Sequence, residues 1–317
     1  MHKIDLWLIG SGNNAIDYLN VLNELDVNTI VVGNSKSSCD RFYLKTKLKP
    51  LTGGLYNNLK VHQAPKSAIV SVSIEQLFKC TKLLIQKGCK NILVEKPGAL
   101  EIKELLELKK LKDKFSANLW IAYNRRFYKS VRLLKKLSDE DGGIKSLFFE
   151  FTELSSLLEN PNFKNHVKEK TLLWNSSHVI DLAFNLIGEP KKDNWQFYNS
   201  GNLKNHKSSS RFNGAGTSQK NIPFTYHADW ECPGRWGVDV MTKNNRFILR
   251  PLEKLQVIPK GSMKAELVYC KKNIEDNFKP GFYQQCKEFL YKDFPNLKSI
   301  EDQIDSFQIY NKIAGYL

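Results

Sequence analysis

The sequence predicts an α/β protein of two domains: a doubly wound parallel sheet, then an α+β domain with an open, mainly antiparallel sheet. Strand-like and helix-like segments alternate as far as about residue 122, as expected when helices connect parallel strands. Beyond that point, strand-like runs follow one another with short turns between them. The 317 residues suffice for two such cores. We therefore expect domains at residues 1–122 and 123–317.

The first domain is expected to begin with a strand that is a mostly apolar run, which is typical of strands buried on both faces, and to continue with similar strands. These strands are predicted at residues 3–9, 28–32, 68–73, 91–94 and 119–122. Apolar residues three and four positions apart indicate helices between them. The helices are predicted at residues 15–25, 75–87 and 102–112.

The second domain is expected to begin with a basic helix at residues 125–137. Further strands are predicted at residues 144–153, 225–230, 236–242, 246–249 and 255–258, and closing helices at residues 281–291 and 300–317. Residues 199–220 are rich in Asn, Ser, Lys and Gly. This composition predicts a mobile loop, which is either a lid over a site or a solvated connection.

The most informative motif is G-x-G-x-x-A, between the first predicted strand and the first predicted helix. Gly10 permits a tight turn, Gly12 lets the backbone approach a pyrophosphate, and Ala15 allows close packing of helix on strand. We therefore expect a dinucleotide at this loop. The predicted contacts come from Gly10, Ser11, Gly12, Asn13, Asn14 and Ala15.

The residues after the second strand favour NADP over NAD. A carboxylate commonly binds the ribose hydroxyls of NAD at this position, but the sequence has Asn34, Ser35 and Lys36, followed by Arg41. Amide, hydroxyl and cationic groups suit a 2′-phosphate, which a carboxylate would repel. The alternative is NAD, with Lys36 and Arg41 as ordinary solvated cations.

Glu95-Lys96-Pro97 follows the predicted strand at residues 91–94, at the sheet edge where ligands of α/β proteins bind. With the glycine motif, it makes the chain resemble the Gfo/Idh/MocA family of oxidoreductases over nearly its whole length. Tyr123-Asn124-Arg125-Arg126-Phe127 and His178-Val179-Ile180-Asp181 also match the family pattern. The resemblance implies a nicotinamide-binding Rossmann domain and hydride transfer at a carbon of a sugar or polyol. It also implies an oligomer formed through the C-terminal sheet.

Carried over residue by residue, Lys96 matches the family's catalytic lysine and His178 its acid or base. The sequence departs from the pattern four residues before His178, where Trp174 replaces the usual Asp. Asp181 lies three positions after His178 and is a candidate to orient the imidazole or raise its pKa. Alternatively, Tyr123 or Lys96 handles the proton and His178 holds the substrate. His178 as a core residue and Asp181 as a surface charge are the structural alternatives.

Further residues are assigned to ligands. Cofactor contacts are also predicted for Ser73, Glu95, Lys96, Asn124 and Arg125, and substrate contacts for Lys96, Trp174, Asn175 and His178. Trp174 either stacks on a sugar or lies in the core. Arg125 and Arg126 either reach phosphates or belong to a solvated basic helix.

Composition excludes several classes of partner. The net charge is +15, but only eight of the 48 cationic residues are arginines, and the lysines are spread along the chain, so we expect no nucleic-acid partner. No apolar run approaches the roughly 20 residues of a membrane span. The N-terminus has no leader-like pattern, which favours the cytoplasm. The six cysteines show no zinc-like spacing, so no metal is expected.

These observations lead to three hypotheses. The first is an NADP-dependent oxidoreductase acting on a carbinol or keto carbon of a sugar or nucleotide-linked sugar, in a role such as surface-polysaccharide synthesis. The second is a catalytically silent member that binds a dinucleotide or sugar as a sensor or assembly subunit, motivated by Trp174. The third is an imine or tetrapyrrole reductase on the same fold, which would not need His178.

Overall fold

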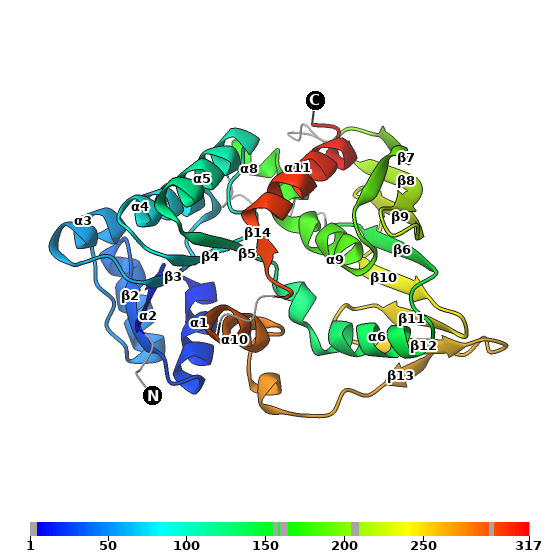
Figure 1. Cartoon of the computed structure of the whole chain (residues 1–317), viewed down its shortest axis with the longest axis horizontal. Coiled ribbons are helices and arrows are strands. Elements are labelled where there is room, and N and C mark those ends of the chain that lie inside the picture. The colour runs from blue at the N-terminus through cyan, green and yellow to red at the C-terminus, as the bar shows by residue number, and fades with distance from the viewer. Residues whose placement is uncertain (1–4, 155–157, 159–163, 204–208, 292–294, 317) are drawn as a thin grey trace. The chain divides into compact units, whose positions relative to one another are not determined.

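The computed structural model describes residues 5–154, 158, 164–203, 209–291 and 295–316. The chain forms two compact units (Figure 1). The first comprises Met1–Tyr123 and Ile274–Asp305, and the second comprises Asn124–Asn273 and Ser306–Leu317. The domains expected at residues 1–122 and 123–317 do not include this return of residues 274–305 to the first unit.

A six-stranded sheet forms the centre of the first unit, in the order β14-β5-β4-β3-β1-β2. The strands are β1 (Asp5–Ile9), β2 (Asn28–Val32), β3 (Ser67–Val70), β4 (Asn91–Glu95), β5 (Asn118–Ala122) and β14 (Lys298–Ser299). Strands β1 to β5 pair in parallel, and β14 joins β5 in the antiparallel direction. The parallel sheet predicted from the alternating pattern is confirmed.

Local sequence explains the beginning of this unit. In β1, Leu6 to Ile9 are all buried although successive side chains point to opposite faces, so both faces of the strand are covered. Helix α1 (Asn13–Glu24) buries the stripe that includes Ala15, Tyr18 and Leu22. Helices α4 (Leu77–Gln86) and α5 (Ile102–Phe115) connect the later strands. In the part of the chain that the structure describes, no helix has the length and apolar character needed to cross a membrane.

Two helices of the first unit are not indicated by the apolar pattern. They are α2 (Lys36–Thr46) and α3 (Gly54–Val61). Helix α2 buries little more than Cys39 and Phe42, so it lacks a recognisable apolar stripe. Its beginning is set by Ser35, whose hydroxyl accepts a hydrogen bond from the Ser38 backbone amide.

The C-terminal segment completes the first unit. Helix α10 (Phe282–Tyr291) packs on α1, with the rings of Phe282 and Tyr18 4.5 Å apart. Strand β14 then extends the sheet beside β5, and α11 (Ile300–Ala314) follows it directly. Figure 1 shows α10, in brown, beside the blue α1, and β14, in orange-red, beside β5.

An eight-stranded sheet forms the second unit, in the order β13-β12-β11-β10-β6-β9-β8-β7. Its strands are β6 (Ser146–Phe151), β7 (Pro190–Ser200), β8 (Arg211–Ser218), β9 (Pro223–Asp229), β10 (Trp236–Met241), β11 (Asn245–Leu249), β12 (Leu255–Pro259) and β13 (Glu266–Val268). Neighbouring strands are antiparallel except β6 and β9, which are parallel. The mainly antiparallel sheet predicted for the C-terminal domain is confirmed.

Helix α9 (Ser177–Ile187) supplies most of the core against this sheet. Nearly every one of its residues is buried, and Phe184 packs edge-on against Phe149 of β6 at 5.6 Å. The helix ends at Ile187 and is followed by Gly188, which has a positive φ. Helix α6 (Lys129–Glu140) and the short α8 (Asn165–Lys168) belong to the same unit.

The loop expected at residues 199–220 is wrong at both strands that enter this range, because β7 extends to Ser200 and β8 spans Arg211–Ser218. Residues 204–208 lie outside the described part. These strands lie at one edge of the sheet and leave most of their side chains exposed or half-buried, so they need few apolar residues. Phe212 is the main anchor of β8, packing 4.9 Å from Trp230 and 5.6 Å from Phe151.

Replacing Gly214 of β8 with Ala tests whether this segment is a packed strand. A methyl group at Gly214 would overlap the Tyr226 ring on β9. We expect Gly214→Ala to lower the free energy of unfolding by about 1–3 kcal/mol because the ring must move. The measurement is denaturant unfolding, with Ala215→Ser at the exposed neighbouring position as the control. Unchanged stability in Gly214→Ala would contradict the packing described here.

Candidate active site

A cavity of about 650 Å³ opens at the carboxyl ends of β1, β2 and β3 in the first unit. Parallel pairing brings these strand ends to one edge of the sheet. Predicted cofactor residues that line it are Gly10, Ser11, Gly12, Asn13, Asn14, Asn34 and Ser73. Other lining residues were not predicted from the sequence, including Gly54, Ser71, Gln76 and Cys80. The only signal for them in the sequence is that they lie at or after the carboxyl ends of predicted strands, which meet at this edge of the sheet.

The glycine loop has the form that a pyrophosphate requires. Gly10 has φ +123°, and a side chain there would overlap the Ser71 carbonyl oxygen, so only glycine fits. Gly12 precedes α1 and has no side chain to cap it, while the space around its α-carbon is open. The first backbone amides of α1 therefore remain available to an anion in the cavity. Ala15 is fully buried beneath them.

A second cavity of about 240 Å³ shares Ser11, Gly12, Asn13 and Ser38 with the first. Two cations, Arg41 and Lys45, also line it. The hydroxyls of Ser11 and Ser38 lie 2.8 Å apart. Among the described residues that line the two cavities there is no Asp or Glu, so this region suits a phosphate.

The remaining residues predicted for this region have other positions. Ser35 caps α2 and hydrogen-bonds the Ser38 hydroxyl, and Lys36 is an exposed residue at the start of that helix. Lys36 is not among the described lining residues of either cavity, so its phosphate contact stays a prediction. Ser38 could have been predicted as a lining residue, because it belongs to a group of serines that follows the second strand.

Lys96 follows β4, at the same edge of the sheet as the glycine loop. Glu95 ends the strand and accepts a hydrogen bond of 2.8 Å from the Tyr18 hydroxyl. The Gly98 amide closes the turn by donating to the Glu95 carbonyl at 3.0 Å. Lys96 itself is half-buried. Tyr123 ends the first unit and is buried, with Lys298 Nζ 5.2 Å from the centre of its ring.

The second unit contains a cluster around His178, which lies in the first turn of α9 and is buried. Its Nε2 lies 3.1 Å from Arg125 Nη1. Because a guanidinium only donates hydrogen bonds, Nε2 accepts and the imidazole proton is on Nδ1. Arg125 also donates to Asn124 at 2.6 Å, and its Cζ lies 5.6 Å from the Trp236 ring.

Asp181 forms a buried ion pair with Arg126. Arg126 Nε and Nη2 each donate to one carboxylate oxygen at 2.7 Å. Asp181 therefore neutralises Arg126, a role that the i, i+3 spacing to His178 does not indicate. The interpretations of Asp181 as a surface charge and of Arg126 as part of a solvated helix are wrong, because both side chains are buried.

Trp174 and Asn175 lie just before α9, in a π-helical turn at Leu172–Ser176. Trp174 is 9% exposed and donates its indole N–H to the Val167 carbonyl at 2.9 Å, which agrees with the core alternative. Asn175 donates to the buried Glu153 carboxylate at 2.8 Å. Their contacts with a substrate stay predictions.

Solved structures of known proteins share the fold of this chain. No protein-family model and no curated protein sequence matches the chain. Solved structures do match over nearly the whole length. They include levoglucosan dehydrogenase in complex with NADH and L-sorbose, with a TM-score of 0.79, 14% identity and coverage of 99% of this chain and 96% of that chain.

Two further solved structures carry a nucleotide sugar in their descriptions, one in the name of the enzyme and one as a bound ligand. UDP-N-acetylglucosamine 3-dehydrogenase from Acidithiobacillus ferrooxidans has a TM-score of 0.75 and 13% identity, covering 100% of this chain and 98% of that chain. The WlbA dehydrogenase from Chromobacterium violaceum, in complex with NADH and UDP-GlcNAcA, has a TM-score of 0.73 and 14% identity, covering 100% and 93%. These neighbours are Gfo/Idh/MocA-type oxidoreductases, so the fold that the sequence resemblance implies is confirmed.

Replacing Asp181 with Asn tests its role as the partner of Arg126. The variant leaves a buried guanidinium without its counter-charge, so we expect the free energy of unfolding to fall by about 3 kcal/mol or more. Denaturant unfolding measures the change, and Asp193→Asn, at an exposed position of β7, is the matched control. Equal stability of Asp181→Asn and the unsubstituted protein would refute a structural role for the ion pair.

Proposed function

We propose that this protein is a nicotinamide-dependent oxidoreductase that transfers a hydride at a carbinol or keto carbon of a sugar or nucleotide-linked sugar. The observation that carries the proposal is the cavity at the uncapped start of α1, which Gly10 and Gly12 keep open. The comparisons support it, because dehydrogenases of sugars and nucleotide sugars share the fold.

The residues of the two cavities fit a dinucleotide. Backbone amides at Gly12 and Asn13 would hold the pyrophosphate, and Asn34 and Ser38 would hold the adenosine ribose. Arg41 and Lys45 would neutralise a 2′-phosphate, which favours NADPH over NADH. When bound, the nicotinamide supplies the position that gains or loses the hydride.

The protein's own residues would bind the substrate and move its proton. We assign Lys96 to a hydrogen bond with the oxygen on the reacting carbon, as its place at the carboxyl end of β4 suggests. We assign His178 to the proton, because the donation from Arg125 leaves the lone pair on Nε2, and this nitrogen can take the proton once Arg125 turns to the substrate. Asp181 contributes by keeping Arg126 and the first turn of α9 in place.

Arg125 favours an anionic substrate such as a nucleotide sugar or a sugar acid. Its guanidinium is half-buried, and its Nε is buried without a hydrogen-bond partner among the described residues. It lies beside the imidazole of His178 and the ring of Trp236. A phosphate or carboxylate would satisfy this cation, and the indole offers an apolar face to a sugar ring.

Titration with NADPH and NADH tests the cofactor. We expect NADPH to bind at least about tenfold more tightly than NADH, because Arg41 and Lys45 contribute charge-assisted hydrogen bonds to the extra phosphate. Energy transfer from tryptophan to the reduced nicotinamide measures both affinities. Arg41→Ala is expected to lower NADPH affinity about tenfold and to leave NADH binding unchanged, whereas Lys49→Ala changes neither. A preference for NADH would reverse the choice of cofactor.

Turnover tests the reaction and the role of Lys96. Nucleotide sugars and sugar acids are incubated with oxidised cofactor, and reduced nicotinamide is followed by its absorbance. We expect Lys96→Met to lower kcat by about 10²–10⁴-fold with cofactor affinity retained, since it removes the hydrogen bond to the reacting oxygen. Lys82→Met, on the surface of α4, is the control. Cofactor binding without turnover on any sugar would favour the silent binding protein that Trp174 suggests.

A further inference from the structure

The segment at Ile274–Asp305 returns to the first unit and brings two fully buried glutamines to the loop that carries Lys96. Gln285 comes from α10 and Gln303 from α11. A fully buried amide is expensive unless it is hydrogen-bonded, so the partners of these side chains indicate what they do.

Gln303 contacts the residue after Lys96. Its Nε2 donates a hydrogen bond of 3.0 Å to the Pro97 carbonyl, and the contact is buried. Pro97 has no amide hydrogen, so its carbonyl is its only backbone hydrogen-bonding group. Because Pro97 directly follows Lys96, the bond from Gln303 fixes the loop on the C-terminal side of the lysine.

Tyr18 contacts the residue before Lys96. Its hydroxyl donates to Glu95 Oε1 at 2.8 Å and lies 3.3 Å from the Gln285 amide oxygen. Burial, together with the nearby Glu95, raises the pKa of Tyr18 well above its usual value, so the hydroxyl keeps its proton as a donor. Gln285 Nε2 has no other hydrogen-bond partner among the described residues. A half-turn of the amide would let this nitrogen donate to the Tyr18 oxygen, which itself donates to Glu95.

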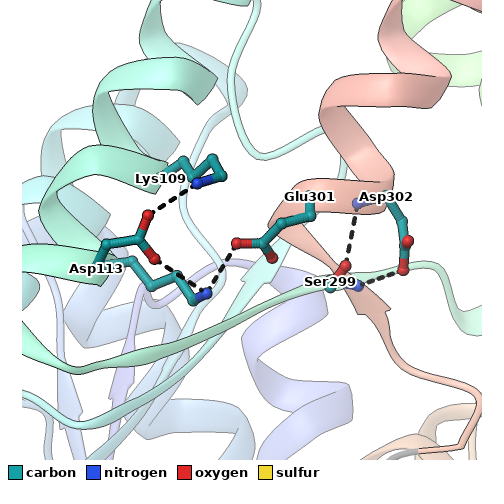
Figure 2. A network of polar contacts seen from close by, with 6 residues as sticks. Lys109, Asp113, Ser299, Glu301 and Asp302 are labelled. Carbon is teal, nitrogen blue, oxygen red and sulfur yellow. Dashed lines mark hydrogen bonds and ion pairs between the residues drawn. The ribbon is translucent and has the colours of Figure 1, made fainter.

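The beginning of α11 is itself anchored, which places Gln303. The Ser299 hydroxyl accepts from the Asp302 amide at 3.0 Å, and Lys112 of α5 donates to Glu301 at 2.8 Å. Figure 2 shows this network, in which Asp113 joins Lys109 to the same group. Gln303 follows Glu301 and Asp302 directly in α11. The contacts that anchor the beginning of the helix therefore also fix the position of the Gln303 side chain.

We propose that Gln303, Gln285 and Tyr18 are positioning residues for Lys96, and that the C-terminal segment is therefore part of the catalytic machinery of the first unit. They hold Lys96 from both sides, through the Glu95 carboxylate and the Pro97 carbonyl. The catalytic meaning of this placement rests on the proposed function. Whether these three residues fix the position of Lys96 does not depend on the reaction, so it can be tested without a substrate.

The first experiment measures the reactivity of Lys96 in the full chain without ligands. The protein is exposed briefly to an amine acylating reagent, and the labelling rate of each lysine is determined by mass spectrometry across a pH series. Gln303→Met keeps the length of the side chain but removes its donor. We expect the rate at Lys96 to change at least about threefold in Gln303→Met, and the rate at Lys82 to remain unchanged. Ile300→Val, a buried change in the same helix, controls for general loosening and should leave Lys96 unaffected.

A second variant keeps the test decisive if Gln303→Met does not fold. Tyr18→Phe removes only the hydroxyl and retains the ring against Phe282. It should also change the labelling of Lys96 at least about threefold. Wild-type labelling of Lys96 in the folded variants would overturn the proposal, as would an equal change in Ile300→Val.

Kinetics then separate this proposal from the proposed function. If wild type turns over a sugar, Gln303→Met and Tyr18→Phe should lower kcat about tenfold and leave the KM for the cofactor within twofold. An unchanged kcat, or a loss confined to the cofactor KM, would contradict positioning of Lys96. Absence of cofactor binding and turnover in wild type would refute the proposed function, whereas the labelling result would still decide whether these residues place Lys96.

Discussion

Parallel pairing in the first sheet is the constraint on which the candidate site depends. Because β1 pairs with both β2 and β3, the loops after these strands all open at one edge of the sheet. Gly10 is then pressed against the Ser71 carbonyl, so the chain turns sharply and leaves the start of α1 facing a cavity. The next strand, β4, delivers Lys96 to the same edge. The position of the cavity thus follows from the order of the strands and from Gly10, where no side chain fits.

The two units hold their functional groups by different physical means. In the first unit, backbone amides and small residues form the site, and the charges near it belong to exposed cations such as Arg41. In the second unit, charged side chains are taken out of water and must be matched, as Asp181 matches Arg126. The first arrangement leaves room for a large ligand, whereas the second fixes the imidazole of His178 beside a guanidinium.

Sequence reasoning succeeded where local pattern decides the structure. The strand at Asn28–Val32 and the turn at Gly10 were predicted from β-branched residues and glycine spacing, and residues of the predicted glycine loop line a cavity. It failed for β8 because this strand, paired between β9 and the edge strand β7 and anchored mainly by Phe212, has the composition of a loop. Long-range contacts gave no local signal: Arg126 and Asp181 are 55 residues apart, and Gln303 and Pro97 are 206 apart.

The return of residues 274–305 has a consequence for how the protein is made. During synthesis, the residues of β1 to β5 leave the ribosome first, yet α10 and β14 appear only after all of residues 124–273 have been translated. Until then Tyr18 lacks the cover of Phe282, and the outer edge of β5 has no β14 partner. The nascent chain therefore holds an incomplete first unit through most of translation, and a chain truncated before residue 282 would lack both α10 and β14.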